Sequence, residues 1–461
     1  MKRKLLLLAL VVLSTICAVC FVGCNENASS NNTNGANADP FIQTSTTPTN
    51  GISYIAKSDG TYMVSTFSTT SAEKNVVIAS EYNGVAVTSI GYSAFGSREI
   101  ESVVIPASIT QIDSFAFFNC KRLRTVTFAE NSKLQSIEHS AFLQCLALDN
   151  VEIPQGTIAI KDRAFRLCNS LKNITIPDSI TEIGAKVFEG CISLELPTYG
   201  NANYIGTKTN PYHVLVSAAQ KSNGTYFSTC NVNASCVVIA DGAFHSNSKL
   251  ESIEFGDSLK YIGSHAFFRC SKLNAVTLGN NIEIVESYAF ADCANLSNVT
   301  IGKNVKKLGL FIFSNTQSVS QFIVDEQNAN YQAIDGHIYS KDATVLIRYA
   351  SGNENDIFSV PSTVTRIENG AFSYSNNLVE AIISPNVTWV GDLAFYYCES
   401  LEILRFKNPE AYLGCYTLLR VSSLTDVYFS GTQAQLDLAS EKANWKYGAN
   451  DGATYLIHCE Q

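Results

Sequence analysis

The stretch that decides the fold is IGSHAFFRC, which runs from Ile262 to Cys270. Twenty-three residues later the chain reads VESYAFADC, and the same pattern returns along most of the sequence. The Phe at its sixth position, Phe267 in this copy, is the anchor on which the copies align. The anchors are Phe95, Phe117, Phe142, Phe165, Phe188, Phe244, Phe267, Phe290, Phe313, Phe372 and Phe395. Most steps between anchors are 22 to 25 residues, and a period of this length predicts a solenoid of stacked coils.

Each copy also has a fixed internal pattern. Aligned on Phe267, apolar residues stand at Ile253, Phe255, Leu259 and Ile262. The alternating V-x-I part closes on Pro or Gly, which predicts a short strand followed by a turn. The A-F-x-x-C-x-x-L part has three- and four-residue spacings, which predict a short helical or 3₁₀ segment. A single coil cannot bury its apolar face alone, so we expect the coils to stack into one β-rich solenoid.

Two anchor steps are longer, at 56 and 59 residues, and indicate inserts. NYIGTKTNPYHVLVSA (203–218) and GHIYSKDATVLIRYA (336–350) each have two β-rich runs about a polar turn, which predicts a β-hairpin in each insert. We expect their aromatic residues to be exposed: Tyr199, Tyr204, Tyr212, Tyr331 and Tyr339. The expected domains are an N-terminal cap (51–89), the solenoid (90–430, with inserts at about 197–226 and 325–354) and a C-terminal cap (431–461).

The N-terminus indicates export. Three basic residues precede an apolar run, Leu5–Val22, which is followed by Gly23 and Cys24. Residues 1–23 therefore read as a signal peptide, and FVGC resembles a bacterial lipobox, which implies that Cys24 is lipidated. The alternative is an uncleaved anchor, because 18 apolar residues can span a bilayer. Residues 24–50, rich in Asn, Ser and Thr, are expected to be a flexible linker that holds the folded part away from the cell membrane.

The charge of the chain argues against nucleic acid as a partner. Loss of residues 1–23 removes three cations and no acids, so the formal net charge changes from −9 to −12. Such an acidic chain repels phosphate backbones, and the sequence has no basic stripe.

The repeat C-x-x-L-x-x-V-x-I-P…I-G-x-x-A-F-x-x-C resembles the BspA-type leucine-rich repeats of bacterial surface proteins, over about residues 51–461. The resemblance implies a solenoid whose strands line one face, and it implies binding or adhesion at the cell surface. It implies no catalytic residues and no cofactor.

The cysteines and histidines also follow the repeat. Seven cysteines share one slot, three residues after the anchor: Cys120, Cys145, Cys168, Cys191, Cys270, Cys293 and Cys398. We predict that they are buried and reduced, like Cys230 and Cys236, and that Cys415 and Cys459 alone are accessible among the thiols that follow Cys24. His139 and His265 do not recur at metal-ligand spacing, so no metal site is predicted.

The exposed half of each predicted strand is the candidate binding face, called here the ribbon. Its candidate ligand-binding residues are Thr125, Thr127, Asn150, Glu152, Asn173, Thr175, Ser252, Glu254, Thr277, Asn298, Thr300 and Tyr428. The same face carries Ser102, Val104, Ala275, Ile403, Arg405 and Asp426. The leading hypothesis is a lipid-anchored, non-enzymatic surface protein that binds a protein or extracellular-matrix ligand through its solenoid. The alternatives are a glycan-binding module, which needs exposed aromatic residues, and a structural spacer; the inserts are a second candidate contact surface.

Overall fold

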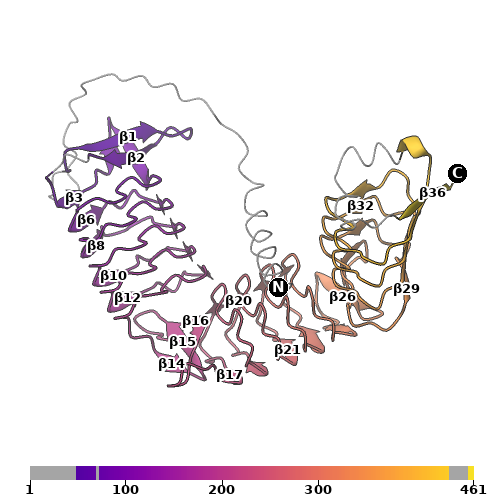
Figure 1. The fold of residues 1–461 in the computed structure, drawn as a ribbon. Coiled ribbons are helices and arrows are strands. Elements are labelled where there is room, and N and C mark those ends of the chain that lie inside the picture. Colours follow the sequence, from indigo (N-terminus) through magenta and orange to yellow (C-terminus); the bar gives the residue numbers. More distant parts are fainter. Residues whose placement is uncertain (1–47, 69–71, 436–454, 461) are drawn as a thin grey trace, which may run out of the picture. The chain divides into compact units, whose positions relative to one another are not determined.

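The computed structural model describes residues 48–68, 72–435 and 455–460, and within them the chain forms a solenoid of short parallel strands (Figure 1). The signal segment 1–23, Cys24 and most of the 24–50 linker lie outside the described residues. No helix in the described part of the chain is long and apolar enough to cross a membrane.

The first column of strands is formed by the V-x-I segments, which confirms that prediction. Its members pair in parallel and in register from coil to coil, as Val276 with Val299. The column has four separate sheets: β3 (Asn75–Val77), β6 (Ser102–Ile105), β8 (Thr125–Phe128), β10 (Asn150–Glu152) and β12 (Asn173–Thr175); β17 (Thr229–Asn231) and β19 (Ser252–Glu254); β21 (Ala275–Leu278), β23 (Asn298–Ile301) and β25 (Phe322–Val324); β29 (Ile357–Ser359), β31 (Glu380–Ile383), β33 (Ile403–Phe406), β35 (Asp426–Ser430) and β36 (Leu456–Glu460).

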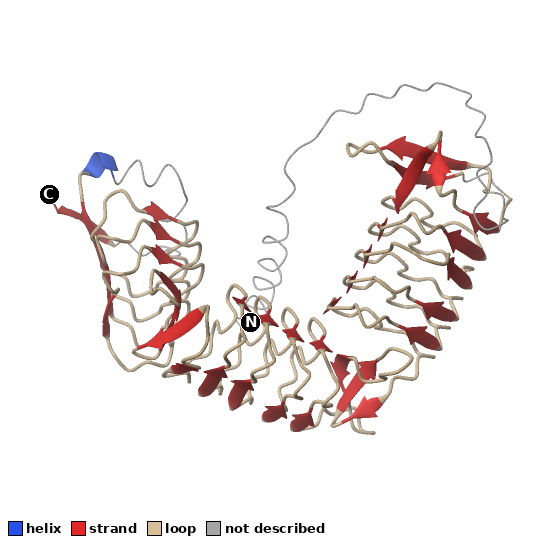
Figure 2. Cartoon of the chain, turned by 180° about the vertical axis from the view of Figure 1, so that it is seen from behind, coloured by secondary structure: helices blue, strands red, loops and turns tan. Residues whose placement is uncertain are grey.

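A second column, which the sequence did not predict, consists mostly of two-residue strands at the I-G step of each coil (Figure 2). Its members are β5 (Val85–Ile90), β7 (Gln111–Ile112), β9 (Ser136–Ile137), β11 (Ala159–Ile160) and β13 (Glu182–Ile183); β16 (Val214–Ala218), β18 (Val238–Ile239), β20 (Tyr261–Ile262), β22 (Ile284–Val285) and β24 (Lys307–Leu308); β28 (Val345–Arg348), β30 (Arg366–Ile367), β32 (Trp389–Val390) and β34 (Tyr412–Leu413). Two columns turn each coil into a flattened loop with the apolar core between them.

The A-F-x-x-C segment is not helical, so that part of the prediction is wrong. Alternate N–H groups donate to the next coil: His265 to Ser287, Phe267 to Ala289 and Arg269 to Ala291. The N–H groups between them close four-residue turns within the coil, as Phe268 donates to the carbonyl of His265. His265 and Arg269 have positive φ angles of 55° and 62°. Left-handed residues on both sides of the anchor produce turns, whereas the spacing alone resembled helix.

The core contains rows of stacked anchor rings. Phe267 and Phe290 are fully buried and stack with centroids 5.0 Å apart and planes 1° from parallel. The residue before each anchor is buried too: it is alanine in most coils, such as Ala266 and Ala289, and Val187 and Ile312 fill the position in two others. Stacked rings thus set the spacing of the coils.

The seven cysteines of the repeat slot are buried and unpaired, as predicted. Each thiol donates to the carbonyl of the anchor one coil earlier: Cys293 to Phe267 at 3.2 Å and Cys270 to Phe244 at 3.2 Å. Burial raises the pKa of Cys270 to about 12. The slot therefore takes a small buried group, and Asn247, Thr316 and Ser375 occupy it in other coils.

Both inserts contain antiparallel hairpins, as predicted. In the first insert β15 (Ala202–Ile205) pairs with β16, and in the second β27 (His337–Ser340) pairs with β28. The last strand of each hairpin joins the second column in parallel, so the inserts belong to the sheet. Strands β14 (Thr198–Tyr199) and β26 (Tyr331–Ile334) add an outer strand to each hairpin.

The expected exposure of the insert tyrosines is wrong for Tyr204 and Tyr339. Their exposed fractions are 0% and 1%, because the hairpins pack against the coil that follows. Tyr212 and Tyr331 are half-buried, and Tyr199 is exposed as predicted. The inserts thus complete the core at the two interruptions of the repeat.

The ends of the solenoid carry extra strands. At the N-terminal end β1 (Ile52–Ala56) and β2 (Tyr62–Phe67) form an antiparallel pair, and β2 pairs in parallel with β5, the first strand of the second column. At the other end β36 pairs in parallel with β35. Trp445 and the rest of 436–454 lie outside the described residues.

Candidate functional site

The ribbon places the predicted residues in two parallel rows along the first column. Thr125 aligns with Asn150, and Asn150 with Asn173; Thr127 pairs with Val104 of the preceding coil. Because the column is divided into four sheets, the ribbon has four stretches. The candidates on β8, β10 and β12 lie on the first stretch, and Ser252 and Glu254 lie on the second. The third stretch carries Thr277, Asn298 and Thr300, and the fourth carries Tyr428.

The N-terminal stretch of the ribbon is polar, and several of its side chains donate hydrogen bonds to one another. The side-chain amide of Asn173 donates to Asn150 at 2.9 Å, and Ser102 donates to Asn75 at 2.7 Å. Glu152, exposed, forms an ion pair with Lys208 of the first insert. Short side chains that bond one another offer a partner little apolar surface.

The C-terminal stretch of the ribbon is different. Arg405 forms an ion pair with Glu380 at 2.6 Å and lies 4.0 Å over the ring of Tyr428. The other face of that ring is covered by His458, with centroids 4.6 Å apart. His458 Nε2 lies 2.6 Å from Asp426 Oδ1, and this hydrogen bond lowers the pKa of Asp426. The result is a row of packed charged and aromatic groups.

Apolar side chains frame this row. Ile357 on β29 is 53% exposed and Leu456 on β36 is 64% exposed, at opposite ends of the same sheet. Ile382 and Ile403 lie between them and are half-exposed. Sequence reasoning included Ile403, Arg405, Asp426 and Tyr428 in the ribbon but missed Ile357, Glu380, Leu456 and His458; the repeat register could have supplied the first two.

Aromatic side chains also line the turn segments, away from the ribbon. His265 stacks on Tyr288 at 4.8 Å, and Tyr288 on Phe311 at 5.1 Å, with planes within 16° of parallel. These rings cover one another, as Arg405 and His458 cover Tyr428. Burial lowers the pKa of His265 to about 4, which keeps this imidazole neutral at pH 7. A sugar ring packs against an open aromatic face, so these stacks do not favour the glycan alternative.

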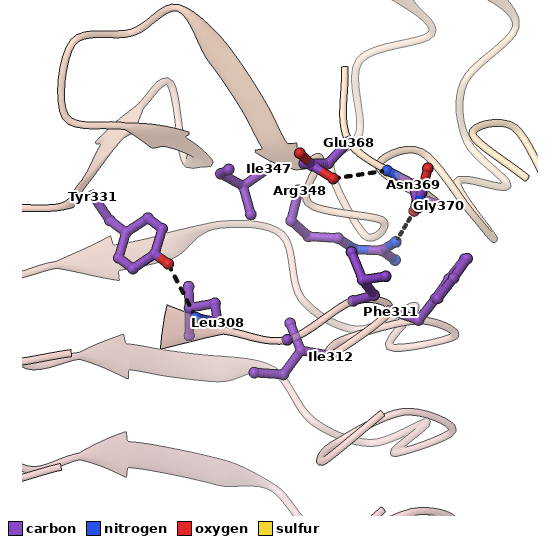
Figure 3. A pocket seen from close by; sticks show the side chains of 11 residues that line it. Leu308, Phe311, Ile312, Tyr331, Ile347, Arg348, Glu368, Asn369 and Gly370 are labelled. Carbon is purple, nitrogen blue, oxygen red and sulfur yellow. Dashed lines mark hydrogen bonds between the residues drawn. The ribbon is translucent and has the colours of Figure 1, made fainter. Parts of the chain in front are cut away.

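A cavity of about 240 Å³ lies beside Arg348, where the second column is interrupted between β24 and β28 (Figure 3). Arg348 is 2% exposed and donates from Nη1 to the carbonyl of Gly370 at 2.6 Å and the hydroxyl of Ser373 at 2.7 Å. Burial lowers its pKa to about 10, so it stays charged at pH 7. The Nη atoms are committed to protein oxygens, and Glu368 on the same wall repels anions. Arg348 thus serves to hold the second insert to the next coil.

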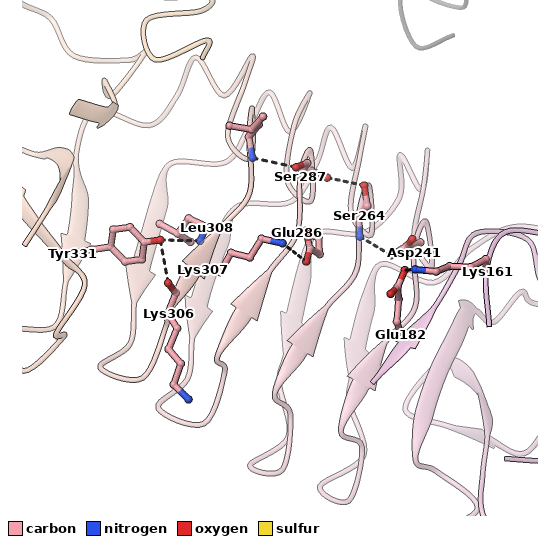
Figure 4. A network of polar contacts seen from close by, with 11 residues as sticks. Lys161, Glu182, Asp241, Ser264, Glu286, Ser287, Lys306, Lys307, Leu308 and Tyr331 are labelled. Carbon is pink, nitrogen blue, oxygen red and sulfur yellow. Dashed lines mark hydrogen bonds and ion pairs between the residues drawn. The ribbon is translucent and has the colours of Figure 1, made fainter. Parts of the chain in front are cut away.

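A polar network crosses the second column (Figure 4). Lys161 pairs with Glu182, and Lys307 pairs with Glu286 at 2.7 Å. Between these ion pairs, Asp241 Oδ1 accepts the N–H of Ser264 at 2.7 Å. Burial and the nearby carboxylates raise the pKa of Asp241 to about 7. Each of these contacts joins neighbouring coils, so the network stabilises the stack. Its carboxylates are paired with a lysine or accept a backbone N–H.

The comparisons with known proteins concern the repeat. The sequence matches the family described as BspA type Leucine rich repeat region, in 6 copies, over residues 88–212, 222–342 and 349–439. No curated protein matches the chain.

Among solved structures, a leucine-rich repeat protein from Bacteroides ovatus is 20% identical, with a TM-score of 0.34, over 89% of this chain and 98% of that one. A leucine rich cell surface protein from Faecalibacterium prausnitzii is 19% identical, with a TM-score of 0.30, over 91% and 100%. The pneumococcal vaccine antigen PcpA is 17% identical, with a TM-score of 0.31, over 90% and 98%. None of these values supports an inference about function.

Proposed function

The chain belongs to the BspA-type leucine-rich repeat family, and from that premise we propose that it is a non-enzymatic protein of the cell surface that binds a protein or extracellular-matrix ligand through the C-terminal stretch of the ribbon. A repeat fold presents a long surface whose exposed side chains can vary without disturbing the core, which suits recognition of a large partner.

The observation that carries the proposal is the side-chain content of β29, β31, β33, β35 and β36. Arg and Tyr are enriched among residues that dominate binding energy in protein interfaces, particularly where neighbouring groups exclude water. Arg405 and Tyr428 are already held in place by Glu380 and His458. Held side chains lose little conformational freedom on binding, and exposed Ile357 and Leu456 add apolar area on either side.

Attachment to the cell is the second part of the proposal. Lipidation at Cys24 would anchor the chain, with residues 24–50 as a spacer. Two or more acyl chains are needed for stable attachment, since each buried CH₂ contributes about 0.8 kcal/mol. The variant Cys24→Ser should lose diacylglycerol labelling and retain the signal segment. Unchanged mass and membrane retention would favour the uncleaved anchor.

The binding proposal is tested by comparing capture of extracellular proteins by the unmodified chain and by two matched double variants. Arg405→Ala with Tyr428→Ala changes the C-terminal stretch, and Thr125→Ala with Thr127→Ala changes the polar N-terminal stretch. We expect the first pair to lose a captured protein that the second pair retains. Identical capture by both, or loss only on deletion of insert 197–226 or 325–354, contradicts the assignment to the ribbon.

A further inference from the structure

The pairing of strands along the ribbon is interrupted at one place where the repeat has no insert. Strands β19 and β21 belong to consecutive coils of equal length, yet they lie in different sheets. One coil further on, β21 and β23 pair over four residues. The space between β19 and β21 measures about 380 Å³, and we call it the ribbon cleft. It is lined by Ser252, Ile253, Glu254, Phe255, Thr277 and Gly279, among others.

The cleft is closed at both ends. At one end the N–H of Asn274 donates to the carbonyl of Glu251 at 3.1 Å. At the other the side-chain amide of Asn281 donates to the carbonyl of Asp257. The facing edges of β19 and β21 carry no ladder hydrogen bonds between these two contacts in the described part of the chain.

The floor of the cleft is apolar. Ile253 and Phe255 occupy core positions but are only half-buried. Their equivalents one coil later, Val276 and Leu278, are 2% and 1% exposed. Without the ladder these two core side chains are partly exposed, as Ile174 on β12 and Phe358 on β29 are at two other sheet ends. An apolar floor with a few polar groups above it is the usual composition of a ligand site.

The rim is acidic. Glu254 and Asp257 are exposed, and no ion pair neutralises either one within the described residues. Among the residues that the structure describes, no Lys or Arg lines the cleft. The net charge of the whole chain, −9, adds to the local negative potential. A cationic group of a ligand would therefore complement the acidic rim.

We propose that the ribbon cleft binds a short extended segment of a partner protein, in which one apolar side chain lies on Ile253 and Phe255 and an adjacent Lys or Arg faces Glu254 and Asp257. An acidic rim above an apolar floor favours a peptide that carries a cation beside an apolar side chain over a hydrocarbon ligand. This inference rests on the proposed function and names the partner chemistry of a second part of the ribbon.

Gly279 offers a way to close the cleft without disturbing the fold. A Cβ atom built there meets no atom within 4 Å, and the residue is absent from those with positive φ. The variant Gly279→Leu should therefore fill the cleft from one wall. The double variant Glu254→Gln with Asp257→Asn removes the rim charge and keeps the shape. Glu152→Gln, on an uninterrupted part of the ribbon, is the matched control.

The probe is a fluorescein-labelled heptapeptide with a central Phe flanked by Lys, compared with the same peptide carrying Glu in place of Lys. Fluorescence polarisation with the full-length chain should show the Lys peptide binding at least tenfold more tightly. Gly279→Leu should abolish this binding, the double variant should weaken it about tenfold, and Glu152→Gln should leave it unchanged. Circular dichroism of each variant establishes that the fold is retained.

Equal affinity for both peptides, or undiminished binding by Gly279→Leu, overturns the inference. So does labelling of a neutral oligosaccharide array by the unmodified chain but not by Gly279→Leu, which would assign the cleft to a glycan. If the cleft variants bind normally while Arg405→Ala with Tyr428→Ala loses protein capture, the inference fails and the proposed function stands.

Discussion

The carboxylate of Asp241 accepts the backbone N–H of Ser264 at 2.7 Å and thereby ties one coil to the next. The same contact recurs where Asp162 accepts from Ala185 and where Asn369 accepts from Asp392, each at 2.8 Å. These residues stand three positions before an anchor. The contact also accounts for the Gly of the I-G step: a Cβ on Gly263 would lie 2.5 Å from the backbone nitrogen of Asp241.

This contact predicts a pH effect. Burial, reinforced by Asp162, Glu182 and Glu286, raises the pKa of Asp241 to about 7, whereas an unfolded Asp titrates near 4. Between about pH 4 and 7 the folded chain holds a proton that the unfolded chain has released, so the free energy of unfolding due to this group falls as the pH rises. Asp241→Asn keeps the accepting oxygen, as Asn369 shows, and removes the titration.

The melting temperature of Asp241→Asn should therefore rise relative to the unmodified chain between pH 5 and pH 8. Asp392→Asn, at the equivalent position of another coil, is the control and should leave the contribution of Asp241 in place. Melting curves of Asp241→Asn and unmodified chain that shift in parallel with pH would contradict the prediction.

Alanine variants of Gly263 and Gly279 test the close contact between Gly263 and Asp241. Gly263→Ala places a methyl group against the backbone of Asp241 and should destabilise the chain by about 1–3 kcal/mol, as overpacking usually does. Gly279→Ala meets no atom within 4 Å and should be neutral or stabilising by up to about 1 kcal/mol. Chemical denaturation measures both. Equal stability of the two variants would show that Asp241 and Gly263 are not in close contact.

Phe290 tests the role of the anchors. Its ring is fully buried and stacks on Phe267 and Phe313, with centroids 5.0 and 5.7 Å away. Phe290→Ala should cost about 3–5 kcal/mol. Because each coil contacts only its neighbours, the loss should open residues 280–300 to protease first. Asn298→Ala with Thr300→Ala, on the surface of the next coil, should change stability by no more than about 0.5 kcal/mol; cleavage that begins elsewhere would argue against local opening.

Thiol labelling tests the cysteine ladder. Cys270 and Cys398 donate to anchor carbonyls, and burial raises the pKa of both thiols to about 12, so few of their thiolates exist at pH 7. A maleimide reagent should reach only Cys415 and Cys459 among the described cysteines of the native chain, and the rest after denaturation. Rapid native labelling of Cys270, detected by peptide mapping, would refute the buried ladder.

The repeat made the fold predictable, because few folds besides a solenoid place apolar residues at the same positions of a period of about 23 residues. The second column escaped prediction because a two-residue strand such as Tyr261–Ile262 has no alternation to detect. The turn segment was predicted as helix because left-handed residues such as His265 leave no mark in the spacing of apolar side chains. Tyr204 was placed at the surface because only the tertiary packing of the hairpin buries it.

The site was predictable only in part. Alternation along V-x-I identified the ribbon, since outward residues of a strand follow from its period of two. The contact of His458 with Asp426 could not be foreseen, because it depends on the register with which β36 joins β35 across a gap in the repeat. The ribbon cleft could not be foreseen either, because the residues of β19 fit the same pattern as those of strands that pair normally.

The central claim is that the C-terminal stretch of the ribbon contacts the ligand, and site-specific photo-crosslinking measures this directly. A benzoylphenylalanine replaces Tyr428 on the ribbon or, as a matched control, Tyr416, which is 45% exposed on a turn segment. Full-length chains displayed on cells are irradiated with extracellular proteins present. We expect position 428 to yield a crosslinked partner that position 416 does not; crosslinking from position 416 alone, or equally from both, would contradict the claim.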